Sequence, residues 1–188
     1  LIFFGQPFIK MWAGDDYGGT YPIVLLLIIP VTIPLTQNIG VEIQKAKNMH
    51  QFRSWVYLGI ALLNVLLSIP LAKVYGGVGA ALGTAISLVI GNGFVMNWYY
   101  NATIGLNIKY FWSQILRFIP SLIIPVICGV LMNIYIDIYK PITFLTSGVA
   151  YVIVFCISMW FLGMNQYEKN LVGKPIGKML RMLRLRKV

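Results

Sequence analysis

Neutral amides and two arginines are the residues best suited to do chemistry in this chain, because they interrupt stretches that are otherwise apolar. Asn64, Asn92 and Asn97 lie within apolar runs, and Arg53 and Arg117 lie near the ends of such runs. An amide in hydrocarbon bonds a neighbouring helix or faces a wet cavity, and an arginine near a membrane surface attracts phosphate. We predict these five residues as the substrate-binding set. Helix–helix bonding and topology-setting charge are the alternatives.

Groups suited to catalysis or metal binding are sparse. The sequence has one histidine, His50, two cysteines, Cys128 and Cys156, and five acidic residues. Both cysteines lie inside apolar runs, where thiols pack as small hydrophobes. No spacing indicates a metal site, a redox pair or a nucleophile with its base. We therefore predict no enzymatic activity and no cofactor. Asp15 and Asp16 are the one adjacent acidic pair that a membrane-embedded glycosyltransferase could use.

Long apolar helices must position the candidate residues. The chain is 59% hydrophobic and only 11% charged, whereas a soluble domain carries about 25% charged residues. About 20 apolar residues in a helix cross a hydrocarbon core of about 30 Å. We predict an all-α, polytopic transmembrane helix bundle over residues 1–170, with a basic loop at 44–53 and a polar connection at 101–112. It has the end of one helix at 1–11 and five complete spans at about residues 21–41, 55–72, 78–100, 113–136 and 142–164.

Small residues recur every four positions in the third of these spans, at Gly79, Gly83, Ser87 and Gly91. Helical spacing stacks them on one face, and such a face lets another helix backbone approach closely inside a bilayer. We predict this face as the main helix-packing surface. A dinucleotide-binding loop is the soluble alternative. Its glycine spacing differs by one residue, however, and no acidic residue follows until Asp137.

Basic residues are divided unevenly between the two sides of such a bundle. The net charge is +10, and the chain has fifteen Lys and Arg residues. With five spans, three of them, Lys10, Lys73 and Lys140, fall on one side, and the other twelve fall on the side of the C-terminus. Because positively charged segments stay in the cytoplasm, we predict a cytoplasmic C-terminus and no nucleic-acid binding. Residues 171–188 are expected to form a basic amphipathic tail on the membrane lipids, with a disordered tail as the alternative.

Several short motifs occur in a distinctive order. They are Ile9–Gly14 followed by Tyr17, then Gln37–Gly40, Asn64, Tyr75–Thr84 and Tyr99–Tyr100. Together they resemble the polysaccharide flippases, the Wzx-like transporters of O-antigen or capsule repeat units in the multidrug/oligosaccharidyl-lipid/polysaccharide superfamily. The resemblance covers about residues 1–118. The tyrosines and tryptophans around residue 99 are also expected at the membrane surface, where an aromatic belt is common.

The resemblance implies a bacterial inner-membrane protein of roughly 12–14 helices in two lobes around a central cavity. This chain would be its C-terminal fragment, comprising most of the second lobe and the final helices. The implied substrate is an undecaprenyl-diphosphate-linked oligosaccharide, flipped across the membrane for surface polysaccharide biosynthesis. A polymerase and other polysaccharide-assembly proteins are the implied partners. Two alternatives stay open: a multidrug/cation antiporter of the same superfamily, and a membrane assembly subunit that does not transport.

Overall fold

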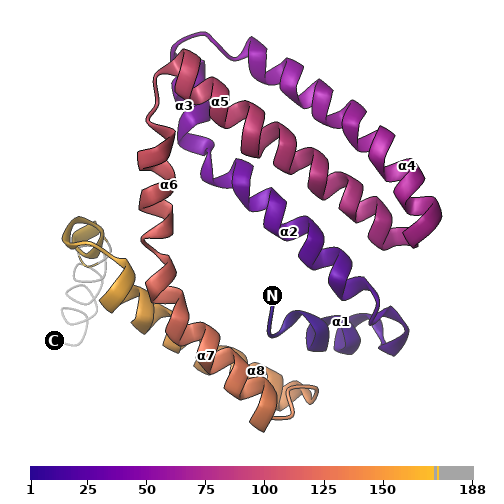
Figure 1. The fold of residues 1–188 in the computed structure, drawn as a ribbon. Coiled ribbons are helices and arrows are strands. Elements are labelled where there is room, and N and C mark those ends of the chain that lie inside the picture. The colour runs from indigo at the N-terminus through magenta and orange to yellow at the C-terminus, as the bar shows by residue number, and fades with distance from the viewer. Residues whose placement is uncertain (172, 174–188) are drawn as a thin grey trace, which may run out of the picture. The chain divides into compact units, whose positions relative to one another are not determined.

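The computed structural model describes residues 1–171 and 173, and this part of the chain is helical without any strand (Figure 1). The predicted all-α fold class is therefore confirmed. Four helical segments are long and apolar enough to cross a membrane: Thr20–Ala46, Gln51–Ile104, Ile108–Tyr135 and Pro141–Gly163. The tail predicted at residues 171–188 lies, apart from 171 and 173, outside the described residues.

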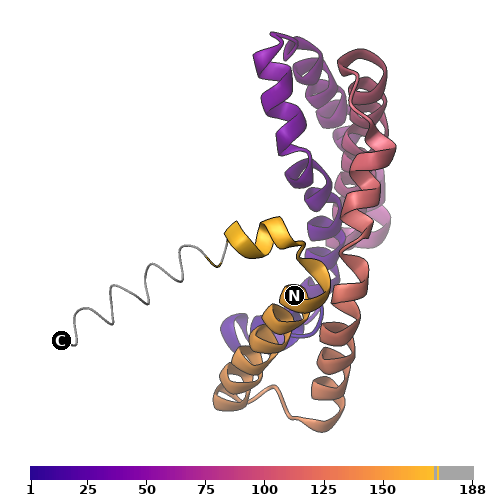
Figure 2. The same cartoon turned by 90° about the vertical axis from the view of Figure 1, so that its left-hand side faces the viewer.

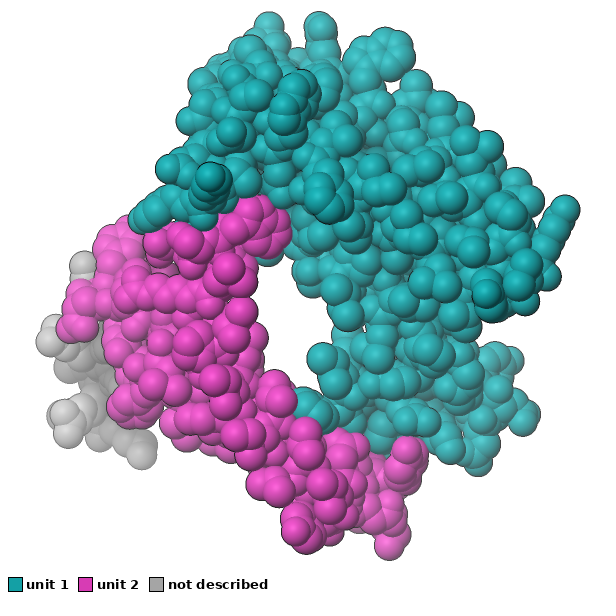
Figure 3. Space-filling view, viewed as in Figure 1, with its two compact units in different colours: residues 1–111 teal, residues 112–188 magenta. Residues whose placement is uncertain are grey.

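The chain divides into two compact units, unit 1 (Leu1–Phe111) and unit 2 (Trp112–Val188), which Figure 3 colours separately. Unit 1 begins with α1 (Gly5–Ala13) and a 3₁₀ turn, η1 (Asp15–Tyr17). α2 (Thr20–Thr36) follows, and Gln37 separates it from α3 (Asn38–Ala46). Pro34 in α2 has no N–H to donate to the carbonyl one turn earlier, which weakens the helix shortly before it divides.

A single helical segment then forms most of unit 1. α4 (Gln51–Leu88) continues into η2 (Val89–Met96), α5 (Asn97–Tyr99) and η3 (Tyr100–Ile104), of which η2 and η3 are π-helical. Within α4, Gly76 has a φ of 58° and a ψ of −138°, which lie outside the helical region. Glycine tolerates such a backbone conformation because it has no Cβ. Figure 1 shows that the chain reverses there, so that residues 51–75 (the first arm) and 77–104 (the second arm) form a hairpin.

The two arms of the hairpin pack through small residues of the second arm. In order, Gly79 lies against Leu71, Gly83 against Ser68, and Gly91 against Ile60. Partner numbers fall as glycine numbers rise, so the arms are antiparallel. A Cβ added at Gly83 would lie 2.7 Å from the Cα of Ser68, and Ser87 is fully buried. The arms approach this closely because the second arm has no side chains at these positions.

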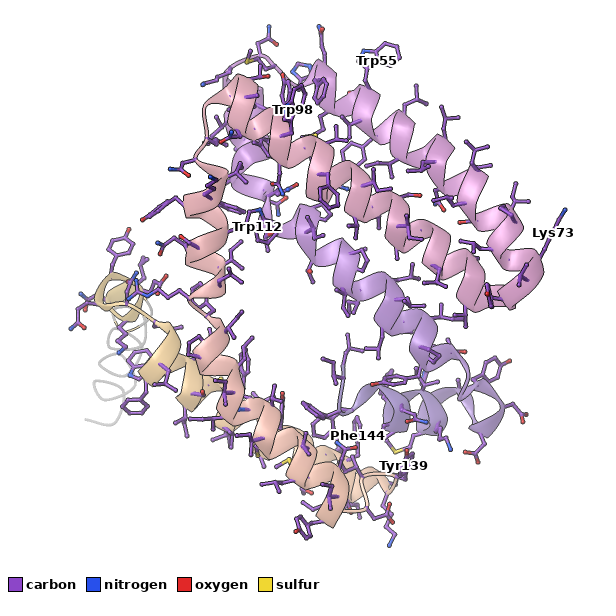
Figure 4. All side chains as sticks on the ribbon, in the orientation of Figure 1. Trp55, Lys73, Trp98, Trp112, Tyr139 and Phe144 are labelled. Atoms are coloured by element: carbon purple, nitrogen blue, oxygen red, sulfur yellow. The ribbon has the colours of Figure 1, made fainter. Side chains whose placement is uncertain are left out.

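One end of unit 1 holds an apolar core. Met96, Tyr99, Tyr100 and Ile104 are buried together there, and residues of α3 and of the first arm pack against them. Phe52 stacks on Tyr99, with ring centroids 4.0 Å apart. Figure 4 shows Trp55 and Trp98 at this end of the hairpin and Lys73 at the opposite end. The core therefore joins α3 to both arms where these helices end.

Unit 2 is a second helical hairpin. α6 (Ile108–Leu116) contains the boundary between the units, and α7 (Ile119–Tyr135) follows it. α7 and α8 (Pro141–Ser158), which ends in the π-helical η4 (Met159–Gly163), lie side by side in Figures 1 and 2. Ser158 Oγ donates a hydrogen bond to the carbonyl of Ser121. Ser121, Pro125 and Gly129, four residues apart on α7, are buried. Small residues thus also hold this hairpin together.

Two predicted loops are largely helical, so those predictions are wrong. The basic loop expected at residues 44–53 is reduced to residues 47–50, because α3 extends to Ala46 and α4 begins at Gln51. The connection expected at 101–112 is reduced to residues 105–107. Polar residues indicated loops in the sequence, yet helix ends at a membrane surface also carry them. The second and third predicted spans form the single segment Gln51–Ile104, which gives four membrane-length segments in place of five spans.

Candidate functional site

Asn64, in the middle of the first arm, accepts hydrogen bonds from two hydroxyl groups. Its Oδ1 lies 2.6 Å from Ser68 Oγ on the same arm and 3.1 Å from Thr84 Oγ1 on the second arm. Each hydroxyl also lies 3.1 Å from the carbonyl oxygen of Ala80. Asn64 Nδ2 has no hydrogen-bond partner in the part of the chain that the structure describes. The amide therefore keeps its donor group for another molecule.

Asn64, Ser68 and Thr84 line a shallow depression of about 530 Å³, which we call the hairpin groove. Its other walls come from α2 and both arms and are apolar: Ile23, Leu27, Val65, Ile69, Gly77, Ala80 and Ala81. Small-molecule sites are typically mostly apolar, with a few polar groups that fix the ligand's orientation. The groove can thus hold a ligand that offers a hydrogen-bond acceptor to Asn64 Nδ2.

A second polar group, the amide seam, joins the α2–α3 junction to the second arm through Gln37, Asn92 and Asn97. Gln37 Nε2 donates to the backbone carbonyl of Asn92 at 3.0 Å and to Asn97 Oδ1 at 2.9 Å. Asn97 Nδ2 donates to the Gly93 carbonyl at 2.7 Å. Asn92 is buried, and its Nδ2 bonds no described residue. Asn97, predicted to bind substrate, here connects helices through its side chain, whereas Asn92 does so only through its backbone carbonyl.

Tyr100 lies against Gly40 at the end of unit 1. A Cβ added at Gly40 would lie 2.9 Å from the tyrosine ring, so only glycine leaves the ring this space. Tyr99 is 8% exposed and Tyr100 only 1%, whereas Trp98 is 64% exposed. The two tyrosines are therefore packed inside unit 1, whereas Trp98 is exposed, as residues of an aromatic belt are. Their partners, Gly40 and Phe52, are distant in sequence.

The two arginines of the predicted set lie in different units. Arg53 Nη2 donates to Tyr57 Oη at 2.6 Å, and Arg53 Nη1 is buried with no described partner. Arg117 is exposed and follows α6 in unit 2. Of the five predicted residues, the structure joins only Asn92 and Asn97, through Gln37, and gives Asn64 a separate groove.

The predicted substrate-binding set did not include the two side chains that complete these polar groups: Gln37 in the amide seam and Thr84 in the hairpin groove. Only the Asn64–Ser68 pair carried a local signal, because residues four apart share one helix face. Thr84 and Gln37 bond partners 20 and 60 residues away. Contacts between residues so far apart in sequence depend on how the helices pack, and no local spacing pattern indicates that.

Another depression, of about 600 Å³, lies between α1 and the beginning of α2. It is lined mainly by apolar side chains, among them Phe8, Ile9, Trp12 and Val24. Within residues 1–171 and 173, no group of three His, Cys, Asp or Glu side chains could hold a metal ion. The hairpin groove is the better candidate site because its polar side chains converge on one point.

Fold and site together define a class: an all-helical protein with membrane-length apolar segments that bury neutral amides and hydroxyls. No protein-family model matches the sequence, and no curated protein or solved structure matches the chain. The chemistry of the groove and the motif resemblance are therefore the basis for a function.

Proposed function

We propose that this chain is part of a transporter that flips undecaprenyl-diphosphate-linked oligosaccharide repeat units across the bacterial inner membrane for surface polysaccharide biosynthesis. One observation supports this most directly: the flippase-like motifs contact one another although they are far apart in sequence. Gln37 bonds Asn97, two residues before the Tyr99–Tyr100 motif, and Tyr100 lies against Gly40. Thr84 bonds Asn64. These contacts support the proposal that the motifs act together.

The hairpin groove suits a substrate with an apolar tail and a hydroxyl-rich head. Such a lipid keeps its tail in hydrocarbon while the head must exchange water for protein hydrogen bonds. Asn64 Nδ2 offers a donor, and the oxygens of Ser68 and Thr84 offer lone pairs, beside apolar walls. Transport makes and breaks no covalent bond, so it calls for hydrogen-bonding groups of this kind and not for a nucleophile or an acid–base pair.

The proposed topology has five crossings. As one straight helix, Gln51–Ile104 would be about 81 Å long, more than twice the thickness of a hydrocarbon core. The break at Gly76 gives two arms of about 38 and 42 Å, each long enough to cross once. With five crossings the C-terminus is cytoplasmic, because twelve of the fifteen basic residues then lie on that side. A polymerase and other polysaccharide-assembly proteins are the proposed partners.

The test uses the full-length protein in its own cells. A strain that lacks it should accumulate lipid-linked repeat units on the inner leaflet and lose surface polymer. Asn64→Leu should reproduce part of this defect at normal protein levels. Asn133→Leu is the control, because Asn133 bonds the Gly129 carbonyl of its own helix in unit 2.

Normal surface polymer in the deletion strain, with no redundant transporter, would overturn the proposal. Export of a cationic dye driven by an ion gradient, with unchanged polymer, would instead indicate the antiporter. Equal defects in the Asn64 and Asn133 variants would remove the groove from the mechanism.

A further inference from the structure

Three side chains at one end of unit 1 carry buried polar atoms that lack hydrogen-bond partners among the described residues. Gln44 is fully buried, and neither its Nε2 nor its Oε1 is bonded. Tyr100 Oη and Arg53 Nη1 are likewise buried and unbonded. Burying a polar group without a partner is unfavourable, and native structures rarely tolerate it. Three such groups make this end of unit 1 a candidate binding site.

The three groups belong to helices that pack together at this end of unit 1: α3, the first arm and the second arm. Tyr100 lies over Gly40, and its Oη would be 3.3 Å from a Cβ at that glycine. Gln44 is one turn beyond Gly40 on the same face of α3, and helical side chains lean toward the N-terminus of their helix. The Gln44 amide therefore leans toward the Tyr100 hydroxyl. Arg53 directly follows Phe52, whose ring stacks on that of Tyr99, the neighbour of Tyr100.

The positive charge of Arg53 at this end of unit 1 is not balanced by a described carboxylate. Arg53 is half-buried and forms no ion pair with a described carboxylate. Of the nearby lysines, Lys45 pairs with Glu42, and Lys47 Nζ donates to the Ile104 carbonyl at 2.9 Å. A partly desolvated guanidinium without a counter-charge favours an anion that also accepts hydrogen bonds.

The position of these groups at the helix ends of unit 1 indicates which anion is available to them. α3 ends at Ala46, α4 begins at Gln51 and η3 ends at Ile104, so three helix ends meet there. Trp55 and Trp98 lie at this end of the hairpin (Figure 4) and are 71% and 64% exposed. Exposed tryptophans near the ends of membrane-length helices are typical of headgroup depth. Phosphoryl groups are the common anions at that depth.

We propose that Arg53, Tyr100 and Gln44 form a binding site for a phosphoryl group, supplied by the headgroup of an anionic phospholipid or by free phosphate. Arg53 Nη1, Tyr100 Oη and Gln44 Nε2 donate to the phosphoryl oxygens. Gln44 Oε1 accepts from a headgroup hydroxyl, which phosphatidylglycerol has. The site lies away from the hairpin groove and does not depend on the proposed transport.

Native mass spectrometry of the purified full-length protein in detergent, titrated with phosphatidylglycerol, tests the site. Arg53→Gln should weaken binding about tenfold, as loss of a hydrogen bond to a charged group does. Tyr100→Phe and Gln44→Met, which change no charge, should weaken it severalfold. Lys73→Gln is the control: it removes one positive charge from an exposed position at the opposite end of the hairpin and should leave the affinity unchanged.

The outcomes separate the two ligand sources. Displacement of the lipid by millimolar inorganic phosphate, and loss of phosphate binding in Tyr100→Phe, would assign the site to free phosphate. Resistance to phosphate would assign it to the headgroup. Equal weakening by Arg53→Gln and Lys73→Gln would reduce the effect to net charge and overturn the site. If Arg53→Gln does not fold, unchanged binding in Tyr100→Phe and Gln44→Met would overturn it instead.

Discussion

At the scale of single residues, Gly83 determines how closely the arms of the hairpin approach each other. An added Cβ would lie 2.7 Å from both the Cα and the backbone nitrogen of Ser68. Gly83→Ala should therefore lower the free energy of unfolding by about 1–3 kcal/mol, as overpacking does. Thermal unfolding of the purified protein in detergent measures the change.

Gly59 supplies the control for this substitution. It lies in the first arm, and a Cβ there would meet nothing within 4 Å. Gly59→Ala should be neutral or stabilise the protein by up to about 1 kcal/mol, because alanine is the better helix former. If Gly83→Ala and Gly59→Ala behave alike, the arms do not pack in the register described.

The amide seam allows a pairwise measurement. Gln37 Nε2 lies 2.9 Å from Asn97 Oδ1. A double-mutant cycle with Gln37→Leu and Asn97→Leu should give a coupling energy of about 0.6–1.7 kcal/mol, the range of side-chain hydrogen bonds between membrane helices. Unfolding of each variant in the same detergent gives the four free energies. A coupling near zero would mean that the bond does not hold the helices together.

Sequence alone predicted part of the site at this scale. Asn64 stood out because an amide is rare in an apolar run, and Arg53 because of its charge. Gln44 and Tyr100 did not stand out. Gln44 looked like part of a polar loop, and Tyr100 like one of several surface aromatics, because their burial depends on Gly40 and on the second arm.

At the scale of elements, Gly76 determines where the hairpin turns. Its φ of 58° with a ψ of −138° is strained for any residue with a Cβ. Gly76→Ala should destabilise the hairpin by about 1–3 kcal/mol. Hydrogen exchange should show faster exchange in residues on both sides of the turn.

The neighbouring glycine is the matched comparison. At Gly77 an added Cβ would meet only the Cδ1 of Ile23, at 3.1 Å, and the end of a flexible side chain can move. Gly77→Ala should therefore leave exchange in the hairpin almost unchanged. Because a Cβ at Gly76 would meet nothing within 4 Å, equal effects at Gly76 and Gly77 would show that the backbone conformation of Gly76 does not determine this turn.

Helix type and approximate position followed from hydropathy, but helix ends did not. Hydropathy falls where polar residues begin, whereas the backbone stays helical as long as its hydrogen bonds continue. Lys45 and Arg53 were therefore placed in a loop although each lies in a helix. The glycine and serine positions of the second arm carried more information, since their spacing of four marked one face, which the structure places against the first arm.

At the scale of the whole molecule, the proposed topology can be tested by labelling. In a background where Cys128 and Cys156 are replaced by alanine, His50→Cys, Tyr75→Cys and Tyr139→Cys each add one thiol. With five crossings, an impermeant maleimide should label Tyr75→Cys and Tyr139→Cys, but not His50→Cys, in spheroplasts. All three should react after lysis, which controls for access.

Labelling of His50→Cys and Tyr75→Cys from the same side would contradict this topology, because the first arm would then not cross. Composition predicted the membrane-length helices, because long apolar segments with few charged residues are typical of helices that cross a membrane. It did not indicate the division at residues 111 and 112, which depends on which helices contact each other.

The bond between Thr84 and Asn64 also bears on how the protein is made. A ribosome delivers the first arm to the translocon before the second, and until then the Asn64 oxygen lacks its partner from the other arm. An amide without a hydrogen-bond partner is less stable in lipid hydrocarbon than inside the translocon. The two arms should therefore leave the translocon together, as a preformed pair, with Lys73 carried across at the leading tip.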